Sequence, residues 1–242
     1  MSYLEVLASF VPGFLVERLA RSHVASLANS SPDVKPPSVT NAEKFQAAVV
    51  EICILRLEEG EVEDDKGMDV EFEQLNSYLE LLIEYILQHG GEIVKQTTTS
   101  ILAFWNTFSE EPSTVVYRAA KCAQVLVDMR DGSSPFCVFC RVAAGTVYAF
   151  WVGRTTFHFV LSGDPFLQLE DHTKLGRSGA HRKKRPGVAL SPEAWDYVRK
   201  YCKGEPEEGS NFMRLQNIKR EISRPGRSST KQIIFFFLIE QC

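Results

Sequence analysis

The sequence lacks an apolar run long enough to cross a membrane as a helix. Such a helix needs roughly 20 predominantly apolar residues, whereas the longest uninterrupted apolar run, residues 233–239, has seven. The amino terminus carries an early acidic residue, Glu5, and has no basic start followed by an apolar core, so it is not typical of a secretory signal. We therefore expect a cytoplasmic protein without a membrane span.

Positive charge is not in excess either. The chain has 27 Lys and Arg residues against 31 Asp and Glu residues, and its formal net charge is -4 at pH 7. This balance gives no reason to expect nucleic acid or an anionic membrane as a partner. The densest basic run, residues 181–185, is interpreted as a solvated loop. A nuclear-import signal or a docking patch for an acidic partner is the alternative interpretation of that run.

Cysteine is too sparse for a disulfide scaffold. Six cysteines lie at irregular intervals in 242 residues, a usage typical of a reduced intracellular protein. Cys137 and Cys140 form a CxxC pattern inside an apolar segment, and no second pair follows. Residues three apart in a strand point to opposite faces, so we predict structural thiols and not a zinc or redox site. The Gly-x-Ser-x-Gly pattern of a serine hydrolase is also absent.

Apolar periodicity predicts an alternation of strands and helices. Helical spacing occurs at 70–89, ended by Gly90 and Gly91, and again at 113–129. A short helix is expected at 164–173, and another begins at Ser191 as its N-cap. Short apolar runs between turn residues predict strands. These strands are residues 47–55, 92–95, 100–105, 136–145, 146–153, 156–163, 188–190 and 212–219.

The chain divides into four parts by composition. We expect a lead-in helix at 1–27, a linker rich in Ser, Pro and Asn at 28–44, and one domain at 45–222. The remaining residues, 223–242, form an atypical tail that we expect to be disordered. No internal repeat is present, and the strand–helix alternation predicts a single α/β sandwich.

Five segments, in this order along the chain, resemble class III nucleotidyl cyclase domains. They are LASFVPGFLVERLA at 7–20, QHGGEIVK at 88–95, VAAGTVYAFWVG at 142–153, FVLSGDPFLQLEDH at 159–172 and VALSPEAW at 188–195. They are most similar to the first cyclase domain of the bicarbonate-regulated adenylyl cyclases. The resemblance implies a ferredoxin-like α+β sandwich, with a mostly antiparallel sheet and helices packed on it.

The resemblance also implies a chemistry. In such cyclases the ribose 3′-hydroxyl of ATP attacks the α-phosphate, and two divalent ions stabilise the charge that develops. Two aspartates hold the ions, one at the end of the first strand and one at the tip of the hairpin after Gly-Gly. A second cyclase domain completes the site, so a homodimer or heterodimer is expected. If the protein is active, its cofactor is magnesium or manganese, with ATP as the substrate.

The residues at the two aspartate positions depart from the family pattern. The hairpin-tip position falls on Thr99, and the first-strand position falls on Glu51 or Cys53, depending on a two-residue choice of register. A hydroxyl is a poor replacement for an anionic ligand of a hard dication. Cys53 would not suit magnesium, whereas Glu51 still offers a carboxylate. The Ser/Gly/Phe turn that normally follows the first strand is missing as well, so we expect an impaired metal site.

Lys95 matches a lysine that helps to hold bicarbonate in the regulated enzymes. The arginine expected to share that anion falls near Glu170, whose carboxylate would repel it. A lysine at the end of a strand, lying over the sheet, is the simpler interpretation.

Three functions remain open from the sequence. The leading hypothesis is a catalytically impaired adenylyl cyclase-like domain that acts in cAMP signalling as a pairing or regulatory half. The second is a working adenylate cyclase, in which Glu51 and another acid such as Glu92 hold one metal ion and a partner domain supplies the other groups. The third is a protein-interaction module that binds no nucleotide.

Overall fold

The computed structural model describes residues 42–57, 65–108, 110–129, 134–153, 157–170 and 186–218. These residues belong to one compact unit, Ala42–Glu221. The predicted boundaries between lead-in helix, linker, domain and tail stay predictions. The lead-in helix, nearly all of the linker, the basic run at 181–185 and the tail lie outside the described residues.

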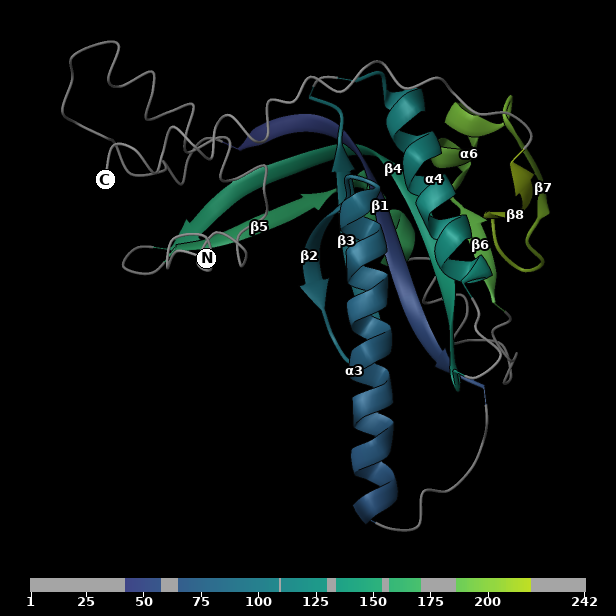
Figure 1. Ribbon diagram of the computed structural model, residues 1–242. Helices are drawn as coiled ribbons and strands as arrows, with labels where there is room; N and C mark the ends of the chain where they lie inside the picture. Colours follow the sequence, from purple (N-terminus) through teal and green to yellow (C-terminus); the bar gives the residue numbers. More distant parts are fainter. Residues whose placement is uncertain are drawn as a thin grey trace. The chain divides into compact units, whose positions relative to one another are not determined.

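The described residues build an eight-stranded sheet (Figure 1). Its order is β2-β3-β1-β4-β6-β8-β7, and β5 pairs with β4. Only the β4–β6 pair is parallel among the strand pairs of the described chain, so the predicted mostly antiparallel sheet is confirmed. The strands are β1 (Glu43–Arg56), β2 (Glu92–Gln96), β3 (Ser100–Asn106), β4 (Phe136–Gly153), β5 (Phe157–Gly163), β6 (Gly187–Leu190), β7 (Cys202–Pro206) and β8 (Met213–Ile218).

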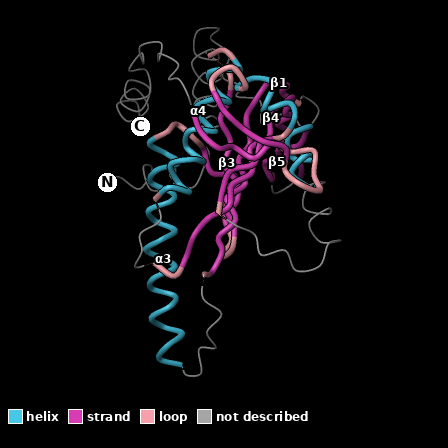
Figure 2. Tube along the Cα trace, turned by 90° about the vertical axis from the view of Figure 1, so that its right-hand side faces the viewer, coloured by secondary structure: helices cyan, strands magenta, loops and turns pink. Residues whose placement is uncertain are grey.

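Two long helices, α3 (Asp65–Gln88) and α4 (Pro112–Asp128), lie side by side in front of the sheet in Figure 1. Leu79, Leu82 and Ile86 of α3 are buried, as the helical spacing predicted. The N-terminal half of α3 extends past the sheet (Figure 2). None of the described helices is both long and apolar enough to span a bilayer.

A short helix, α6 (Pro192–Val198), follows β6 directly. The predicted N-cap is confirmed, because the Ser191 side chain accepts a hydrogen bond from the amide of Ala194 at 3.2 Å. The Ser191 amide in turn donates to the carbonyl of Val142 on β4 at 2.8 Å. The cap therefore anchors the start of the helix to the middle of the sheet.

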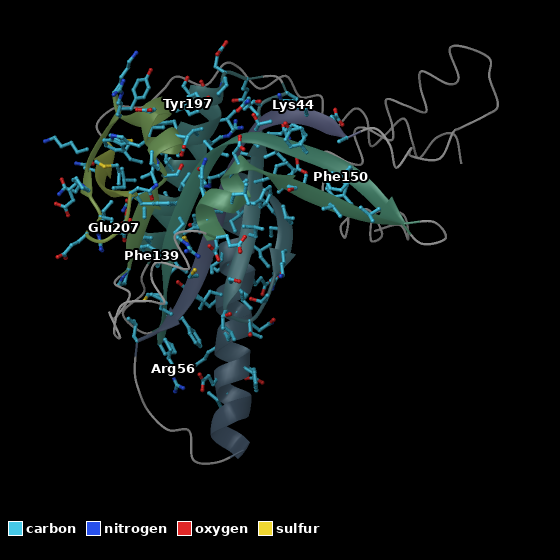
Figure 3. All side chains as sticks on the ribbon, turned by 180° about the vertical axis from the view of Figure 1, so that it is seen from behind. Lys44, Arg56, Phe139, Phe150, Tyr197 and Glu207 are labelled. Carbon is cyan, nitrogen blue, oxygen red and sulfur yellow. The ribbon has the colours of Figure 1, made fainter. Side chains whose placement is uncertain are left out.

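The second face of the sheet carries a different helical segment, residues 164–170. Cys140 of β4 points toward Cys122 of α4, and burial raises the pKa of Cys140 well above its usual value. Arg141, the next residue of β4, points to the opposite face, where its guanidinium donates to the carbonyl of Leu169 at 3.4 Å. Residues 164–170 therefore cover the face that α4 does not, and Figure 3 views the molecule from this side.

One sequence prediction about the strands was wrong, and one strand was missed. Residues 136–145 and 146–153 were expected to be separate strands, but they form one strand, β4, whose residues from Phe136 to Ala149 pair with β1. Gly145 is not a turn residue; a Cβ at this position would lie 3.1 Å from the Cβ of Asp164, so glycine allows a close approach of the 164–170 segment. Strand β7 was missed because it is a short edge strand, CKGEP, without apolar alternation.

Candidate functional site

The sheet register places two of the predicted site residues, Lys95 and Glu51, in one row with Arg141. Lys95 lies opposite Leu102, Leu102 lies opposite Glu51, and Glu51 lies opposite Arg141. Directly opposed residues of adjacent strands point to the same face of a sheet. These side chains therefore share the face that α4 leaves open, which we call the Arg141 face.

Arg141 forms a buried ion pair with Glu51. Its side chain is 2% exposed, whereas that of Glu51 is 25% exposed. One guanidinium nitrogen donates to the Glu51 carboxylate and also lies 4.0 Å from the sulfur of Cys53. A second guanidinium nitrogen donates to the carbonyl of Leu169. Because a buried charge is costly unless it is paired and hydrogen-bonded, these contacts are what make the guanidinium tolerable inside the fold.

Cys53 lies at the end of β1 that meets the tip of the β2–β3 hairpin. Cys53 is opposite Ser100 in the β1–β3 register, and the amide of Ile54 donates to the carbonyl of Thr99 at 2.9 Å. Of the two first-strand candidates, Cys53 is therefore the residue beside the hairpin tip. Glu51 lies two residues further into the sheet, roughly 7 Å along the strand.

The hairpin tip is organised by a threonine hydroxyl. The Thr97 hydroxyl oxygen accepts hydrogen bonds from the backbone amides of Thr99 at 3.3 Å and Ser100 at 3.0 Å. Such side-chain bonds to the backbone are a usual way to stabilise a tight turn. Thr99 itself is exposed, so its side chain offers a neutral hydroxyl to solvent.

These donors do not fit a hard divalent cation. The place beside the hairpin tip offers a thiol from Cys53 and a hydroxyl from Thr99, whereas magnesium and calcium prefer carboxylate and carbonyl oxygens. The nearby Glu51 carboxylate already pairs with a guanidinium. Within the described ranges, no three or more His, Cys, Asp or Glu side chains are grouped closely enough to hold a metal ion.

The other predicted site residues are placed further away. Lys95 is exposed on the edge strand β2, two strand spacings from Glu51, or roughly 10 Å. Glu92 is 8% exposed and accepts a hydrogen bond from the side-chain amide of Asn106 at 3.4 Å. It lies opposite Phe104, in a different row from Glu51. Glu170 is exposed at the end of the 164–170 segment, next to Leu169.

Arg141 is the residue that sequence reasoning missed. A signal for it exists, because it is the only charged residue in the apolar segment 136–145. A lone charge in a buried strand requires a partner of opposite sign. Glu51 is likewise the only acid in the strand predicted at 47–55. On this argument the sequence could have predicted an ion pair between Glu51 and Arg141.

Neither protein-family models nor curated proteins give a match to this chain. Solved structures do match it. The guanylate cyclase domain of RhGC from Catenaria anguillulae, in complex with GTP, has a TM-score of 0.54 at 15% identity and covers 74% of this chain and 100% of its own. The adenylyl cyclase CyaB from P. aeruginosa also has a TM-score of 0.54, at 14% identity, and covers 76% of this chain and 100% of its own.

A dimeric guanylyl cyclase domain of the RhoGC fusion protein from Blastocladiella emersonii is similar as well. It has a TM-score of 0.54 at 14% identity, and it covers 73% of this chain and 96% of its own. At this level of identity the likeness concerns the fold. The fold of residues 42–218 is therefore that of class III adenylyl and guanylyl cyclase domains, as the sequence resemblance implied.

Proposed function

We propose that this chain is an adenylyl cyclase-like domain that acts in cAMP signalling as a pairing or regulatory half. The proposal is supported by the residues at the two positions where the resemblance expects metal-binding aspartates. Thr99, at the hairpin tip, offers a neutral hydroxyl, and of the two first-strand candidates Glu51 is paired with Arg141 whereas Cys53 is a thiol. The fold supports a place in nucleotide cyclase chemistry, and these residues argue against independent turnover. The preference for adenine rests on the similarity of the five sequence segments to adenylyl cyclases.

A pairing role is supported by exposed apolar side chains on a projecting hairpin. The outer end of the β4–β5 hairpin, which carries Phe150, extends away from the rest of the sheet (Figures 1 and 3). Tyr148 is 39% exposed and Val152 is 46% exposed on the same strand. Their even spacing places both on one face of the hairpin. An exposed apolar strip of this kind is suited to contact with a second domain.

The charge state of the Arg141 face also supports a regulatory half over a catalyst. The Glu51 carboxylate and the Arg141 guanidinium neutralise each other, so the pair offers no net charge to a nucleoside triphosphate. A working site needs cations that contact phosphate oxygens. Arg141 is 2% exposed and so cannot serve as such a cation from its present position.

Activity measurements with the purified chain test this proposal. The chain is incubated with ATP or GTP and with magnesium or manganese, alone and mixed with the second cyclase domain of a bicarbonate-regulated adenylyl cyclase. We expect no cyclic nucleotide from the chain alone, and association with the second domain in sedimentation experiments. Turnover by the chain alone that disappears in Glu51→Ala would contradict the proposal and favour the working enzyme.

A measurement of nucleotide binding distinguishes the third hypothesis, a protein-interaction module, from the pairing half. A protein-interaction module without a nucleotide pocket would bind neither ATP nor GTP, alone or in the mixture. A pairing half would instead change the affinity or the turnover of the second domain for its nucleotide. Association with no effect on the nucleotide would therefore favour the interaction module.

A further inference from the structure

Electron-pair donors converge on the guanidinium of Arg141. Among the described residues they include a carboxylate oxygen of Glu51, the backbone carbonyl oxygen of Leu169 at 3.4 Å, and the sulfur of Cys53 at 4.0 Å. Carboxylate, carbonyl and thiol groups are the groups with which proteins usually bind metal ions. Here the cation at their centre is a side chain of the protein.

We propose that Arg141 is a built-in cation that takes the place of a divalent metal ion on this face and prevents one from binding. The inference deepens the proposed function, because it names the residue that keeps the site without metal. It does not depend on what the domain pairs with.

Position and charge support this role. Cys53, which lies beside the hairpin tip, is also the residue whose sulfur lies near the guanidinium. A divalent ion held by a ligand at position 53 would therefore stand close to a positive charge in a partly water-excluded place, where repulsion is strong. Such an ion would also compete with Arg141 for the Glu51 carboxylate.

The guanidinium differs from a bound ion because it is covalently part of β4, so chelators cannot remove it. The described fold should consequently need no divalent ion for its charge balance, in contrast with a site whose carboxylates repel one another when the metal is absent.

The inference is tested by introducing aspartates at positions 53 and 99, in one protein that keeps Arg141 and in one that lacks it. The double variant Cys53→Asp/Thr99→Asp keeps Arg141, and the triple variant adds Arg141→Ala. Manganese binding is measured with MnCl₂ alone, by calorimetry and by the loss of the free-ion paramagnetic resonance signal. We expect the triple variant to bind Mn²⁺ at least tenfold more tightly than the double variant.

The matched control is Cys53→Asn/Thr99→Asn/Arg141→Ala, which has the same shape but no new carboxylates. It should bind Mn²⁺ at least tenfold more weakly than the triple variant. If the double and triple variants bind Mn²⁺ equally, Arg141 is not what excludes the metal. If the triple variant binds no better than its amide control, the place is not a cation site and the inference is overturned.

A single substitution keeps the inference testable if the triple variant does not fold. In Cys53→Asp a carboxylate is placed beside the retained guanidinium, and in Cys53→Asn a neutral amide is placed there. We expect Cys53→Asp to melt at a higher temperature than Cys53→Asn. The reverse order would overturn the role of Arg141 as the cation of this site. The proposed pairing function is measured on the unsubstituted chain, so either idea can fail without the other.

Discussion

The backbone amide of Ile54 donates to the carbonyl of Thr99 at 2.9 Å, which joins the end of β1 to the tip of the β2–β3 hairpin. The contact uses main-chain atoms only, so it does not depend on which side chains stand at positions 53 and 99. Substitutions at positions 53 and 99 should therefore leave this backbone contact in place and change only the side-chain chemistry.

The Glu51–Arg141 pair should respond unequally to the loss of each partner. Glu51→Ala leaves a guanidinium that is 2% exposed without its counter-charge, and we expect a loss of about 3 kcal/mol in the free energy of unfolding. Arg141→Met leaves Glu51, which is 25% exposed and can turn to water, so the loss should be smaller. Urea unfolding at pH 7 measures both.

The control for this pair is Glu205→Ala, which removes an exposed acceptor of the Gln216 side chain. It should change the free energy of unfolding by less than about 0.5 kcal/mol. Equal losses for Glu51→Ala and Arg141→Met would contradict the argument from burial.

Stability should fall in alkaline solution through two buried groups. Burial raises the pKa of the Cys122 thiol from 9.0 to about 12. Burial, with Cys137 and Cys140 adding to it, raises the pKa of Tyr78 from 10.0 to about 12. The unfolded chain releases these protons at lower pH than the folded chain does, so the stabilisation is complete below pH 9 and is lost as the pH rises toward 12.

Urea unfolding from pH 8 upward, on the wild type and on Cys122→Ala, measures this effect. The variant should be less stable at pH 8, because it leaves a small cavity, but it should lose less stability as the pH rises. Parallel decline of the two proteins would show that Cys122 does not contribute to the alkaline loss.

The cap of α6 should contribute a measurable part of the stability. Ser191 is fully buried, and its hydroxyl accepts the amide of Ala194 at 3.2 Å. We expect Ser191→Ala to cost about 1 kcal/mol in thermal or urea unfolding. Ser77→Ala is the control, because the exposed Ser77 hydroxyl only donates to the Glu73 carbonyl within α3. A cost for Ser77→Ala as large as that for Ser191→Ala would contradict the capping role.

Gly91 should tolerate no side chain, because Trp105 occupies the space. A Cβ at Gly91 would lie 2.5 Å from Cζ2 of Trp105, whose indole N–H donates to the carbonyl of His89 at 3.0 Å. Gly91→Ala should therefore displace the indole, lower the free energy of unfolding by about 2 kcal/mol or more, and alter the tryptophan fluorescence of the native protein.

Gly209→Ala is the matched control for Gly91→Ala. Gly209 has a positive φ of 78° but nothing within 4 Å of the added Cβ. Its substitution should cost only the backbone strain, about 1 kcal/mol, and leave the fluorescence unchanged. An unchanged fluorescence in Gly91→Ala would mean that the backbone at Gly91 moves and that the Trp105 indole stays in place.

Local pattern determined much of the fold. Helical spacing at Leu79, Leu82 and Ile86 predicted α3, and the Ser191–Pro192 pair predicted the start of α6, since these signals depend on neighbours within about one turn. By resemblance, the sequence also indicated Thr99 and either Glu51 or Cys53 as the positions where metal ligands would be expected, and the choice between Glu51 and Cys53 was left open.

Tertiary structure decided what depends on residues far apart in the chain. Gly145 continues the strand because β4 pairs with β1 on both sides of it, and this pairing with a distant segment cannot be read from the local pattern. The partner of Glu51 is Arg141, 90 residues away, and only the β1–β4 register brings them together. The sequence specifies which side chains carry a charge. Whether such a charge is available to a ligand depends on burial and pairing, which only the packed sheet determines.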